Sequence, residues 1–544
     1  MKLPLPPLLL LLVLPCLSAT EPAEGPYKPS WDSLASQYQA PEWFRDAKFG
    51  IWAHWTAQCV PEQGDWYARN MYEEEIVDKK TGKSHPSAQY KYHVEHYGPQ
   101  SKFGFKDIDN LWKAEKWDPE KLIALYKRAG ARYFVALANH HDNLDCYDSK
   151  YQPWNTLNIG PKKDIVGGWA KAARAAGLRF GVTVHAGRTW SWFEPAQGSD
   201  TNGPLMGVPY DGKLTKADGK GTWWEGYDPQ DLYAQNHKPG EKPSREYCDK
   251  FYNRTIDLID KYQPDLLYFD DGVLPLKGVD EQYGLKIAAH LYNSNMQKHG
   301  GNEAVMNTKG LNEEQRKCLV WDIERGKSDR IEPLPWQTDT CIGGWHYARS
   351  VFEHHGYKKP QDVIRMLVDI VSKNGNLLLN VPLRGDGTID EDEVACLEGI
   401  AKWTAVNGEA IYATRPWEVS GEGPSTLPAG TEEKGHFGGL KDVSSKPYTS
   451  EDIRFTRSKD GKTLYAIALE WPKDGKLVVK SLAAGAGKIN GLSLLGHEGK
   501  IDWEQTADGL TVTMPKEKPC DVAYSLRITG ENLKPALKAA PSAQ

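Results

Sequence analysis

Two adjacent carboxylates at the end of an apolar stretch are the first candidates for chemistry in this sequence. The apolar and aromatic run 266–269 ends in Asp270 and Asp271, which a glycine follows. Successive side chains of a strand point to opposite faces, so only one of the two aspartates faces a given pocket, and we expect it to be Asp270. On its own, an Asp-Asp-Gly sequence after a strand is equally typical of a plain turn.

A second pair of carboxylates follows the apolar stretch 318–321. Asp322 and Glu324 stand two positions apart, so they share one face of an extended chain. Two carboxylates that face each other across a glycosidic bond can hydrolyse it with retention, one as nucleophile and one as acid/base. We expect Asp270 and Glu324 to take these roles, with Asp322 as the rival acid/base. In isolation, these charges are typical of a surface salt-bridge cluster.

Histidines also follow apolar runs, and together with a carboxylate they could bind a metal. They are His54, His140, His141 and His185. A barrel hydrolase of the amidohydrolase type would have His-x-His on its first strand, and only His54 matches that pattern. Adjacent His140 and His141 do not easily present both rings from one regular strand. A metal-dependent hydrolase therefore stays a minority alternative, and no Gly-x-Ser-x-Gly nucleophile motif occurs.

The elements that carry these residues alternate between helical and strand patterns. Helical periodicity covers Pro119 to Ala129 and Arg245 to Tyr262, and a short apolar strand follows each. This alternation indicates β-α-β units, and polar residues at the carboxyl ends of the strands are typical of a barrel active site. A doubly wound sheet is the alternative, but its Gly-x-Gly-x-x-Gly signature is missing. We predict an α/β fold, a (β/α)8-like barrel followed by a C-terminal β-sandwich.

Changes in composition along the chain predict four parts. Residues 1–19 combine one positive charge, a short apolar run and small residues, which is typical of a secretory signal peptide. We predict the catalytic barrel over 30–412, a β-sandwich of short alternating strands over 413–531, and a disordered tail over 532–544. The expected protein is exported to a periplasmic, secreted or lumenal location, and it has no membrane attachment after the signal is removed.

Composition excludes some partners and favours others. The net charge of −6 and the pI near 6.2 leave no basic footprint for nucleic acid. The 20 Trp and 26 Tyr suit a protein that stacks sugar rings, although large cores also use aromatic residues. No Cys-x-x-Cys pair occurs, so a structural zinc site is not indicated.

Several short motifs between about residues 30 and 420 belong together. They are Trp43-Phe44 with the run from Ala47 to Ile51, His54-Trp55, Asp65-Trp66-Tyr67, His140-His141-Asp142, Asp270, and the late stretches 372–382, 387–389 and 407–412. As a set they resemble the α-L-fucosidases of glycoside hydrolase family 29. The resemblance implies Asp270 as nucleophile and Glu324 as acid/base. It implies sugar contacts from His54, Asp65, Trp66, His140, His141, Tyr268 and Lys309.

Some positions depart from the family pattern. Asp65 replaces a glutamate, Lys309 replaces an arginine, and Asn143 replaces a glycine that usually follows the paired histidines. Lysine cannot reproduce a bidentate guanidinium contact, so the identity of the sugar stays open.

We predict an exo-acting, retaining α-L-fucosidase that removes terminal α-L-fucosyl residues from glycans by double displacement. Its expected partner is a fucosylated oligosaccharide or glycoconjugate, and the resemblance implies no metal and no cofactor. Two alternatives remain beside the metal-dependent hydrolase. One is an α-L-galactosidase with the same machinery, whose substrate differs by a hydroxyl on C6. The other is a glycan-binding protein without activity.

Overall fold

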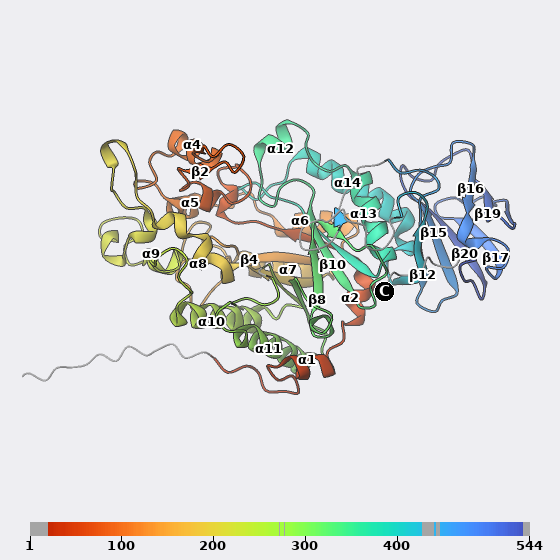
Figure 1. Ribbon diagram of the computed structural model, residues 1–544, viewed down its shortest axis with the longest axis horizontal. Helices are drawn as coiled ribbons and strands as arrows, with labels where there is room; N and C mark the ends of the chain where they lie inside the picture. The colour runs from red at the N-terminus through yellow and green to blue at the C-terminus, as the bar shows by residue number, and fades with distance from the viewer. Residues whose placement is uncertain (1–19, 271, 277, 427–439, 442–446, 537–544) are drawn as a thin grey trace, which may run out of the picture.

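We describe the fold from a computed structural model of the chain. The structure describes residues 20–536 except 271, 277, 427–439 and 442–446. The predicted signal peptide, Asp271 and most of the predicted tail lie outside these residues. In Figure 1 the barrel elements occupy the centre, and the C-terminal strands gather at one end of the molecule.

A closed barrel of parallel strands forms the larger part of the chain. Its strands are hydrogen-bonded in the order β1-β11-β10-β8-β7-β6-β5-β4, and β1 pairs with both β11 and β4 to close the ring. Every residue of β1 and β4 is buried, as expected for strands covered on both faces. The predicted fold class is confirmed. The strands are β1 (Phe49–Ala53), β4 (Tyr133–Asn139), β5 (Arg179–Val184), β6 (Leu266–Phe269), β7 (Val305–Lys309), β8 (Val320–Glu324), β10 (Trp336–Cys341) and β11 (Gly375–Asn380).

The surrounding helices begin and end at residues that the sequence marks. Asp118 caps α6 by accepting a hydrogen bond from the Lys121 amide, and Gly130 ends the helix with φ 110°, a conformation that favours glycine. Ser244 caps α10 in the same way through the Tyr247 amide. The main helices are α6 (Pro119–Ala129), α7 (Ile165–Ala175), α10 (Arg245–Tyr262), α11 (Gln282–His299), α13 (Pro360–Ser372) and α14 (Glu391–Asn407).

Strand boundaries differ from the predicted ones where the strands are polar. β8 continues to Glu324, so Asp322 and Glu324 lie within this strand rather than after the apolar stretch 318–321. β7 likewise includes the polar residues Asn307, Thr308 and Lys309. The sequence pattern does not predict β10, because Gln337 and Asp339 interrupt its apolar character. This strand pairs with β8 and β11 and is needed to close the barrel.

Short helices lie in the segments that follow β1 and β5. They are α3 (Tyr67–Asn70), α4 (Ala88–His96), α5 (Phe105–Leu111), α8 (Thr189–Trp192) and α9 (Pro229–Leu232). In Figure 1 the helices α4, α5, α8 and α9 lie on the side of the barrel away from the C-terminal strands.

The C-terminal strands form two antiparallel sheets with a core of their own. The indole nitrogen of Trp403 on α14 donates to the Ala523 carbonyl at 2.8 Å, and Arg454 pairs with Asp369 on α13 at 2.6 Å. These contacts join the sandwich to the barrel helices. One sheet contains β12 (Thr414–Glu422), β14 (Ile453–Ser458), β15 (Thr463–Ala468), β17 (Lys488–Leu494) and β20 (Tyr524–Glu531), and the other contains β16 (Lys476–Val479), β18 (Trp503–Gln505) and β19 (Leu510–Thr513).

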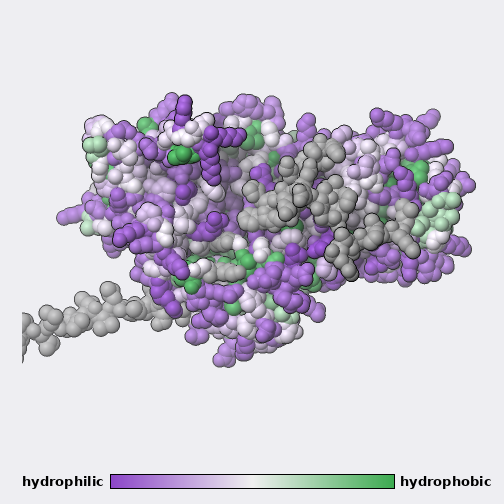
Figure 2. All heavy atoms as spheres, viewed as in Figure 1, coloured by the Kyte–Doolittle hydropathy of each residue, from purple (hydrophilic) through white to green (hydrophobic). Residues whose placement is uncertain are grey.

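The molecular face in Figure 2 is mainly hydrophilic, with small, scattered apolar areas. Within the part of the chain that the structure describes, no helix combines the length and the apolar character needed to cross a membrane.

Candidate active site

A pocket of about 450 Å³ lies at the carboxyl ends of the barrel strands, where barrel enzymes place their active sites. It brings together most of the residues that the sequence predicts for the site, although they come from distant parts of the chain. The residues that line it are His54, Asp65, Trp66, His140, His141, Arg188, Asp270, Gly272, Glu324, Arg325, Trp345 and His346.

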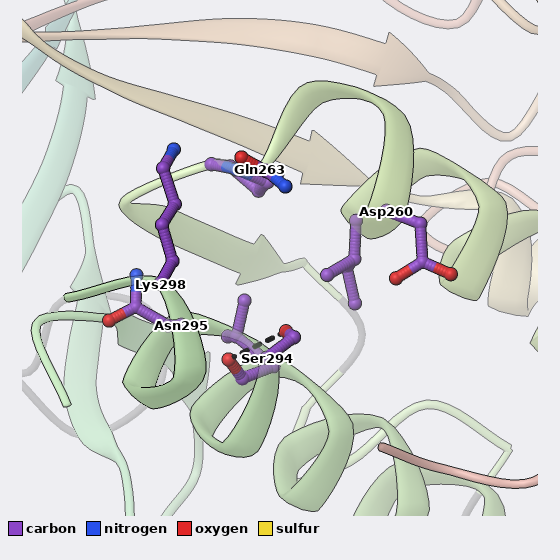
Figure 3. Close-up of a pocket in the computed structure, with 8 residues that line it drawn as sticks. Asp260, Gln263, Ser294, Asn295 and Lys298 are labelled. Carbon is purple, nitrogen blue, oxygen red and sulfur yellow. Dashed lines mark hydrogen bonds between the residues drawn. The ribbon is translucent and has the colours of Figure 1, made fainter. Parts of the chain in front are cut away.

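A smaller hollow between α10 and α11 offers a comparison (Figure 3). Gln263 and Pro264, which precede β6, contribute to its wall, so it lies at the amino end of that strand. Asp260 is the single carboxylate among its lining residues. One carboxylate cannot act as both nucleophile and separate acid/base, so the pocket at the carboxyl ends is the candidate active site.

Asp270 and Glu324 share one ammonium group in this pocket. The side chain of Lys309 is only 2% exposed, whereas those of Asp270 and Glu324 are 22% and 19% exposed. Lys309 Nζ is paired with the Asp270 carboxylate and donates to Glu324 Oε2 at 2.7 Å. The two carboxylates therefore face the pocket, and the ammonium lies beneath them.

The surroundings of Asp270 keep it ionised. Burial alone would raise the pKa of its carboxyl, but the positive charge of Lys309 and the contact with His185 outweigh burial and lower that pKa below its ordinary value. His185 Nδ1 lies 3.3 Å from Asp270 Oδ2. An ionised carboxylate with one exposed edge is suited to nucleophilic attack.

Asp322 lies deeper than Glu324. Its carboxylate is fully buried, accepts a hydrogen bond from Gln337 Nε2 at 2.7 Å, and lies 3.3 Å from the Tyr268 hydroxyl. Asp322 and Glu324 both point into the barrel, as their spacing predicts, but only Glu324 lines the pocket. Geometry therefore favours Glu324 over Asp322 as the acid/base.

Two residues predicted to contact the sugar lie below the pocket rather than in its wall. Tyr268 is completely buried, and its hydroxyl faces Asp322 and Asp339. Lys309 is 1% exposed, since β7 extends to include it and its side chain is directed under the carboxylates. Both residues support the floor of the pocket in this structure, and their contact with a sugar stays a prediction.

Imidazole rings form one wall of the pocket. The ring centroids of His54 and His140 are 5.1 Å apart, and those of His140 and His141 are 4.5 Å apart. Burial lowers the pKa of His54 and of His140 well below the ordinary value, and it lowers the pKa of His141 to about 3. The rings are therefore neutral near neutral pH. Nδ1 of His140 is bonded to Gln58 and Nδ1 of His141 to the His185 carbonyl, so each of these two rings has its Nε2 left for a sugar hydroxyl.

Two groups of histidines could be considered as metal ligands. Within each group the candidate nitrogens lie within 4.8 Å of one another, and His140 belongs to both. Gln58 Nε2 donates to His140 Nδ1 at 2.9 Å, which leaves the ring proton on Nε2, so neither nitrogen of His140 is ready to bind a metal. The groups are His54, His140 and His346, and His140, His141 and His185.

The loop after β10 supplies pocket residues that the sequence reasoning missed. His346 is fully buried, and its amide donates to Asp65 Oδ1 at 2.7 Å. Asp65 therefore holds this loop in place as well as lining the pocket. The ring of Trp345 lies 5.6 Å from that of His54. The Gly-Gly-Trp-His sequence at 343–346 is the signal, but it can be recognised only if β10 is assigned first.

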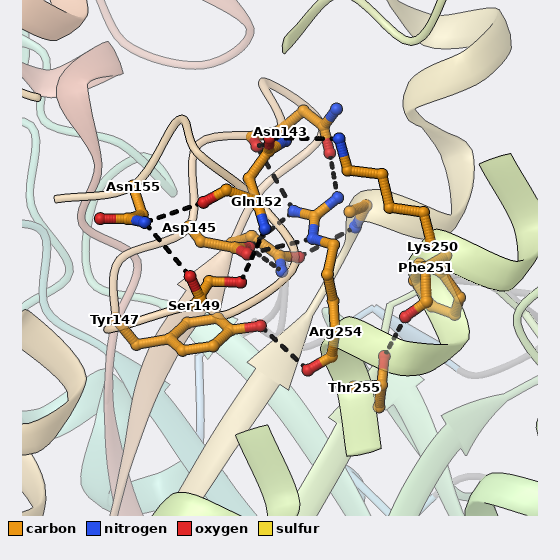
Figure 4. Close-up of polar contacts among 12 residues, drawn as sticks. Asn143, Asp145, Tyr147, Ser149, Gln152, Asn155, Lys250, Phe251, Arg254 and Thr255 are labelled. Carbon is orange, nitrogen blue, oxygen red and sulfur yellow. Dashed lines mark hydrogen bonds and ion pairs between the residues drawn. The ribbon is translucent and has the colours of Figure 1, made fainter. Parts of the chain in front are cut away.

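Buried polar contacts hold the loop that follows His140 and His141 (Figure 4). Arg254 on α10 donates to both oxygens of Asp145, at 3.0 and 2.6 Å, and to Asn143 Oδ1 at 2.6 Å. Asn139 Nδ2 donates to the same aspartate at 2.9 Å, and Asn139 Oδ1 accepts from the His185 amide at 3.1 Å. The network therefore fixes the ends of β4 and β5 relative to each other.

The departure from glycine at position 143 has a physical explanation. Asn143 has φ 66°, a left-handed conformation that asparagine tolerates better than most residues. Its amide group donates to the Leu232 carbonyl at 3.0 Å. The hydrogen bonds of the Asn143 side chain offset the cost of a left-handed backbone conformation in a residue other than glycine.

Comparison with known proteins identifies the family. Residues 15–409 match the family model described as α-L-fucosidase, and residues 446–529 match the α-L-fucosidase C-terminal domain. The tissue α-L-fucosidase of Rattus norvegicus is 28% identical over 541 residues, which covers 96% of this chain and 97% of the relative.

Solved structures of Thermotoga maritima proteins have the same fold. An α-L-fucosynthase in complex with α-L-Fuc-(1-2)-β-L-Fuc-N3 has a TM-score of 0.67 at 28% identity and covers 93% of this chain and 100% of its own. An α-fucosidase in complex with fucose has a TM-score of 0.64 at 28% identity and covers 92% of this chain and 100% of its own. With a family model that matches well over half of its length, the chain belongs to the α-L-fucosidase family.

Proposed function

We propose that this protein is an exo-acting α-L-fucosidase that works by double displacement with retention. Asp270 attacks the anomeric carbon while Glu324 gives its proton to the departing glycosidic oxygen. The aglycone leaves, and a fucosyl ester forms on Asp270. Glu324 then takes a proton from water, whose oxygen attacks the same carbon and breaks the ester, which releases fucose and restores both carboxyl groups.

The shared contact with Lys309 is the observation that carries this mechanism. Because one ammonium reaches both carboxylates by hydrogen bonds, their nearest oxygens are no more than about 5.5 Å apart, the separation typical of retaining glycosidases. Inverting enzymes place their carboxylates about 6.5–9.5 Å apart to leave room for a water molecule.

The shape and lining of the pocket support a single terminal sugar. Buried Tyr268 and Lys309 close its lower end, so the sugar enters from one side, as an exo-acting enzyme requires. His54, His140 and His141 offer donors and acceptors to the hydroxyls, and Asp65 and Trp66 complete the contacts. Fucose is the favoured sugar because the related solved structures contain fucose or a fucosyl disaccharide.

The Asp270→Ala variant tests the assignment of the nucleophile with 4-nitrophenyl α-L-fucoside as substrate. We expect a loss of at least about 10³-fold in kcat, because no covalent intermediate can form. The matched control is Asp260→Ala, which removes the carboxylate at the other end of the barrel and should leave kcat near the wild-type value. Turnover by Asp270→Ala at a rate close to wild type would show that the nucleophile is a different residue.

Azide rescue separates Glu324 from Asp322. Azide should accelerate Glu324→Ala and give a fucosyl azide of retained configuration, since azide replaces water on the glycosyl-enzyme. Asp322→Ala should give no such product. A retained azide product from Asp322→Ala alone would reverse the assignment.

The same substrates test the alternatives. Comparing the aryl α-L-fucoside with the aryl α-L-galactoside decides between the two sugars, and binding without turnover of either would indicate a glycan-binding protein. We also propose export with removal of residues 1–19 and a domain division into 30–412 and 413–531. N-terminal sequencing of the mature protein and limited proteolysis test these two proposals.

A further inference from the structure

Four carboxyl groups surround one lysine in the upper part of the barrel. Lys309 contacts Asp270 and Glu324 above, and its Nζ lies 4.0 Å from Asp339 Oδ2. Asp322 also contributes to the electrostatic field at the ammonium. A single positive charge cannot balance four negative charges in a buried site, and an unbalanced buried charge is costly. Some of these groups must therefore carry protons.

The two deeper carboxyls are the ones placed to hold a proton. Asp322 and Asp339 are 0% and 1% exposed, and the hydroxyl of Tyr268 lies 3.3 Å from the first and 3.0 Å from the second. A hydroxyl has one proton to donate, so it satisfies one of these oxygens at a time. Gln337 Nε2 donates to Asp322 only. The other oxygen of Asp339, Oδ1, is buried and has no hydrogen-bond partner among the described residues, a setting that disfavours an ionised carboxylate.

We propose that Asp322 and Asp339 form a carboxyl pair that carries one proton, and that this pair holds Lys309 between Asp270 and Glu324. Both aspartates act through Lys309 and are positioning residues, and the inference rests on the proposed function. Burial supports it by raising the pKa of Asp322 to about 6 and the pKa of Asp339 well above its ordinary value, with further elevation of the latter from the charge of Asp322.

In the proposed reaction a negative charge passes from Asp270 to Glu324, and a constant charge beneath Lys309 suits this transfer. Asp270 loses its negative charge when its ester forms, and Glu324 gains one when it gives up its proton. The ammonium of Lys309 therefore faces one negative charge above it both before and after the ester forms. A pair below it with a fixed charge of −1 keeps Lys309 centred while that charge moves from one side to the other.

Asparagine variants test how many negative charges the pair of Asp322 and Asp339 carries. Asp339→Asn and Asp322→Asn each leave one carboxylate, so the charge of −1 is kept, and we expect kcat within about threefold of wild type. The double variant removes the charge, and we expect kcat to fall at least about 30-fold with KM changed less than about threefold, because the pair does not line the pocket. If each single variant loses as much as the double, or if the double matches wild type, the one-proton pair is wrong.

Infrared spectra test the proton directly and do not depend on turnover. In the difference spectrum of wild type minus each single variant near neutral pH, the carbonyl absorption of one protonated carboxyl group should appear, since absorption from other protonated carboxyls such as that of Glu324 is common to both proteins and cancels. Retention of that absorption in both variants would overturn the inference. Thermal melts of all variants show whether any has lost its fold. A wild-type protein that fails to hydrolyse the fucoside would refute the proposed function and leave the spectroscopic result intact.

Discussion

Replacing Lys309 with methionine should move the pH dependence of the reaction. The ammonium of Lys309 is a main reason why the pKa of Asp270 lies below its ordinary value despite burial. Methionine keeps much of the side-chain volume and removes the charge. The pKa of Asp270 should therefore rise, and a protonated Asp270 cannot act as a nucleophile.

The size of the shift follows from the contact between the two groups. Opposite unit charges about 4 Å apart interact by about 4 kcal/mol at the effective dielectric constant of about 20 that suits protein sites. One pKa unit corresponds to about 1.4 kcal/mol, so removing the ammonium should raise the pKa of Asp270 by up to about 3 units. His185 stays at 3.3 Å from the same carboxylate, and this contact keeps the shift below that limit.

The assay is the pH profile of kcat/KM, whose acidic limb reports ionisation in the free enzyme. The limb should move to higher pH in Lys309→Met, and activity should recover at higher pH. Lys309→Arg keeps the charge and should leave the limb in place. Lys250→Met is a matched control, because Lys250 pairs with Asp231 at 2.6 Å outside the pocket. If the Lys309→Met profile superimposes on that of wild type after scaling, Lys309 does not set the ionisation of Asp270.

Two further predictions concern stability. The pKa of His141 in the folded state is lowered to about 3, below the unfolded value of about 6.5. The neutral ring therefore contributes stability above pH 6.5, and this contribution is lost as the pH falls. Between pH 7.5 and pH 5 the loss is about 2 kcal/mol. Between pH 7.5 and pH 5, His141→Asn should lose less free energy of unfolding than the wild-type protein, as measured by denaturant unfolding at the two pH values. Equal losses in the two proteins would contradict this reasoning. Arg254→Ala leaves Asp145 buried without its cation and should lower the free energy of unfolding by about 3–5 kcal/mol. The exposed Arg527→Ala should cost no more than about 1 kcal/mol, and similar values for both variants would show that the buried network is not stabilising.

The sequence predicts the elements whose local signals agree with each other. For α6, an aspartate cap, a proline at the first position and a terminal glycine agree with the apolar stripe, and the predicted bounds Pro119–Ala129 match the structure. The strand 266–269 is predicted equally well, because it is apolar and buried along its whole length. Where propensity, capping and burial all indicate the same structure, one sequence is enough.

The depth of a side chain inside the barrel is what the sequence does not reveal. A spacing of two places Asp322 and Glu324 on the same face of β8, and the structure agrees. Their different roles depend on where β8 lies relative to β7 and β10, whose pairing places Asp322 beside Lys309 and Gln337, and Glu324 beside Asp339. Register between strands that are far apart in sequence has no local signal.

The strand that the sequence pattern misses, β10, is missed because it carries the buried polar residues Gln337 and Asp339. The sequence rule for a buried strand is a continuous apolar run, and β10 breaks it with Gln337 and Asp339. These residues are tolerated inside the barrel because each has a polar partner: the hydroxyl of Tyr133 donates to Gln337 at 2.9 Å, and that of Tyr268 donates to Asp339 at 3.0 Å. Such a network stabilises the fold only when its members are satisfied. A strand that fails the apolar rule yet is required to close the barrel therefore marks the layer that supports the two carboxylates proposed to react.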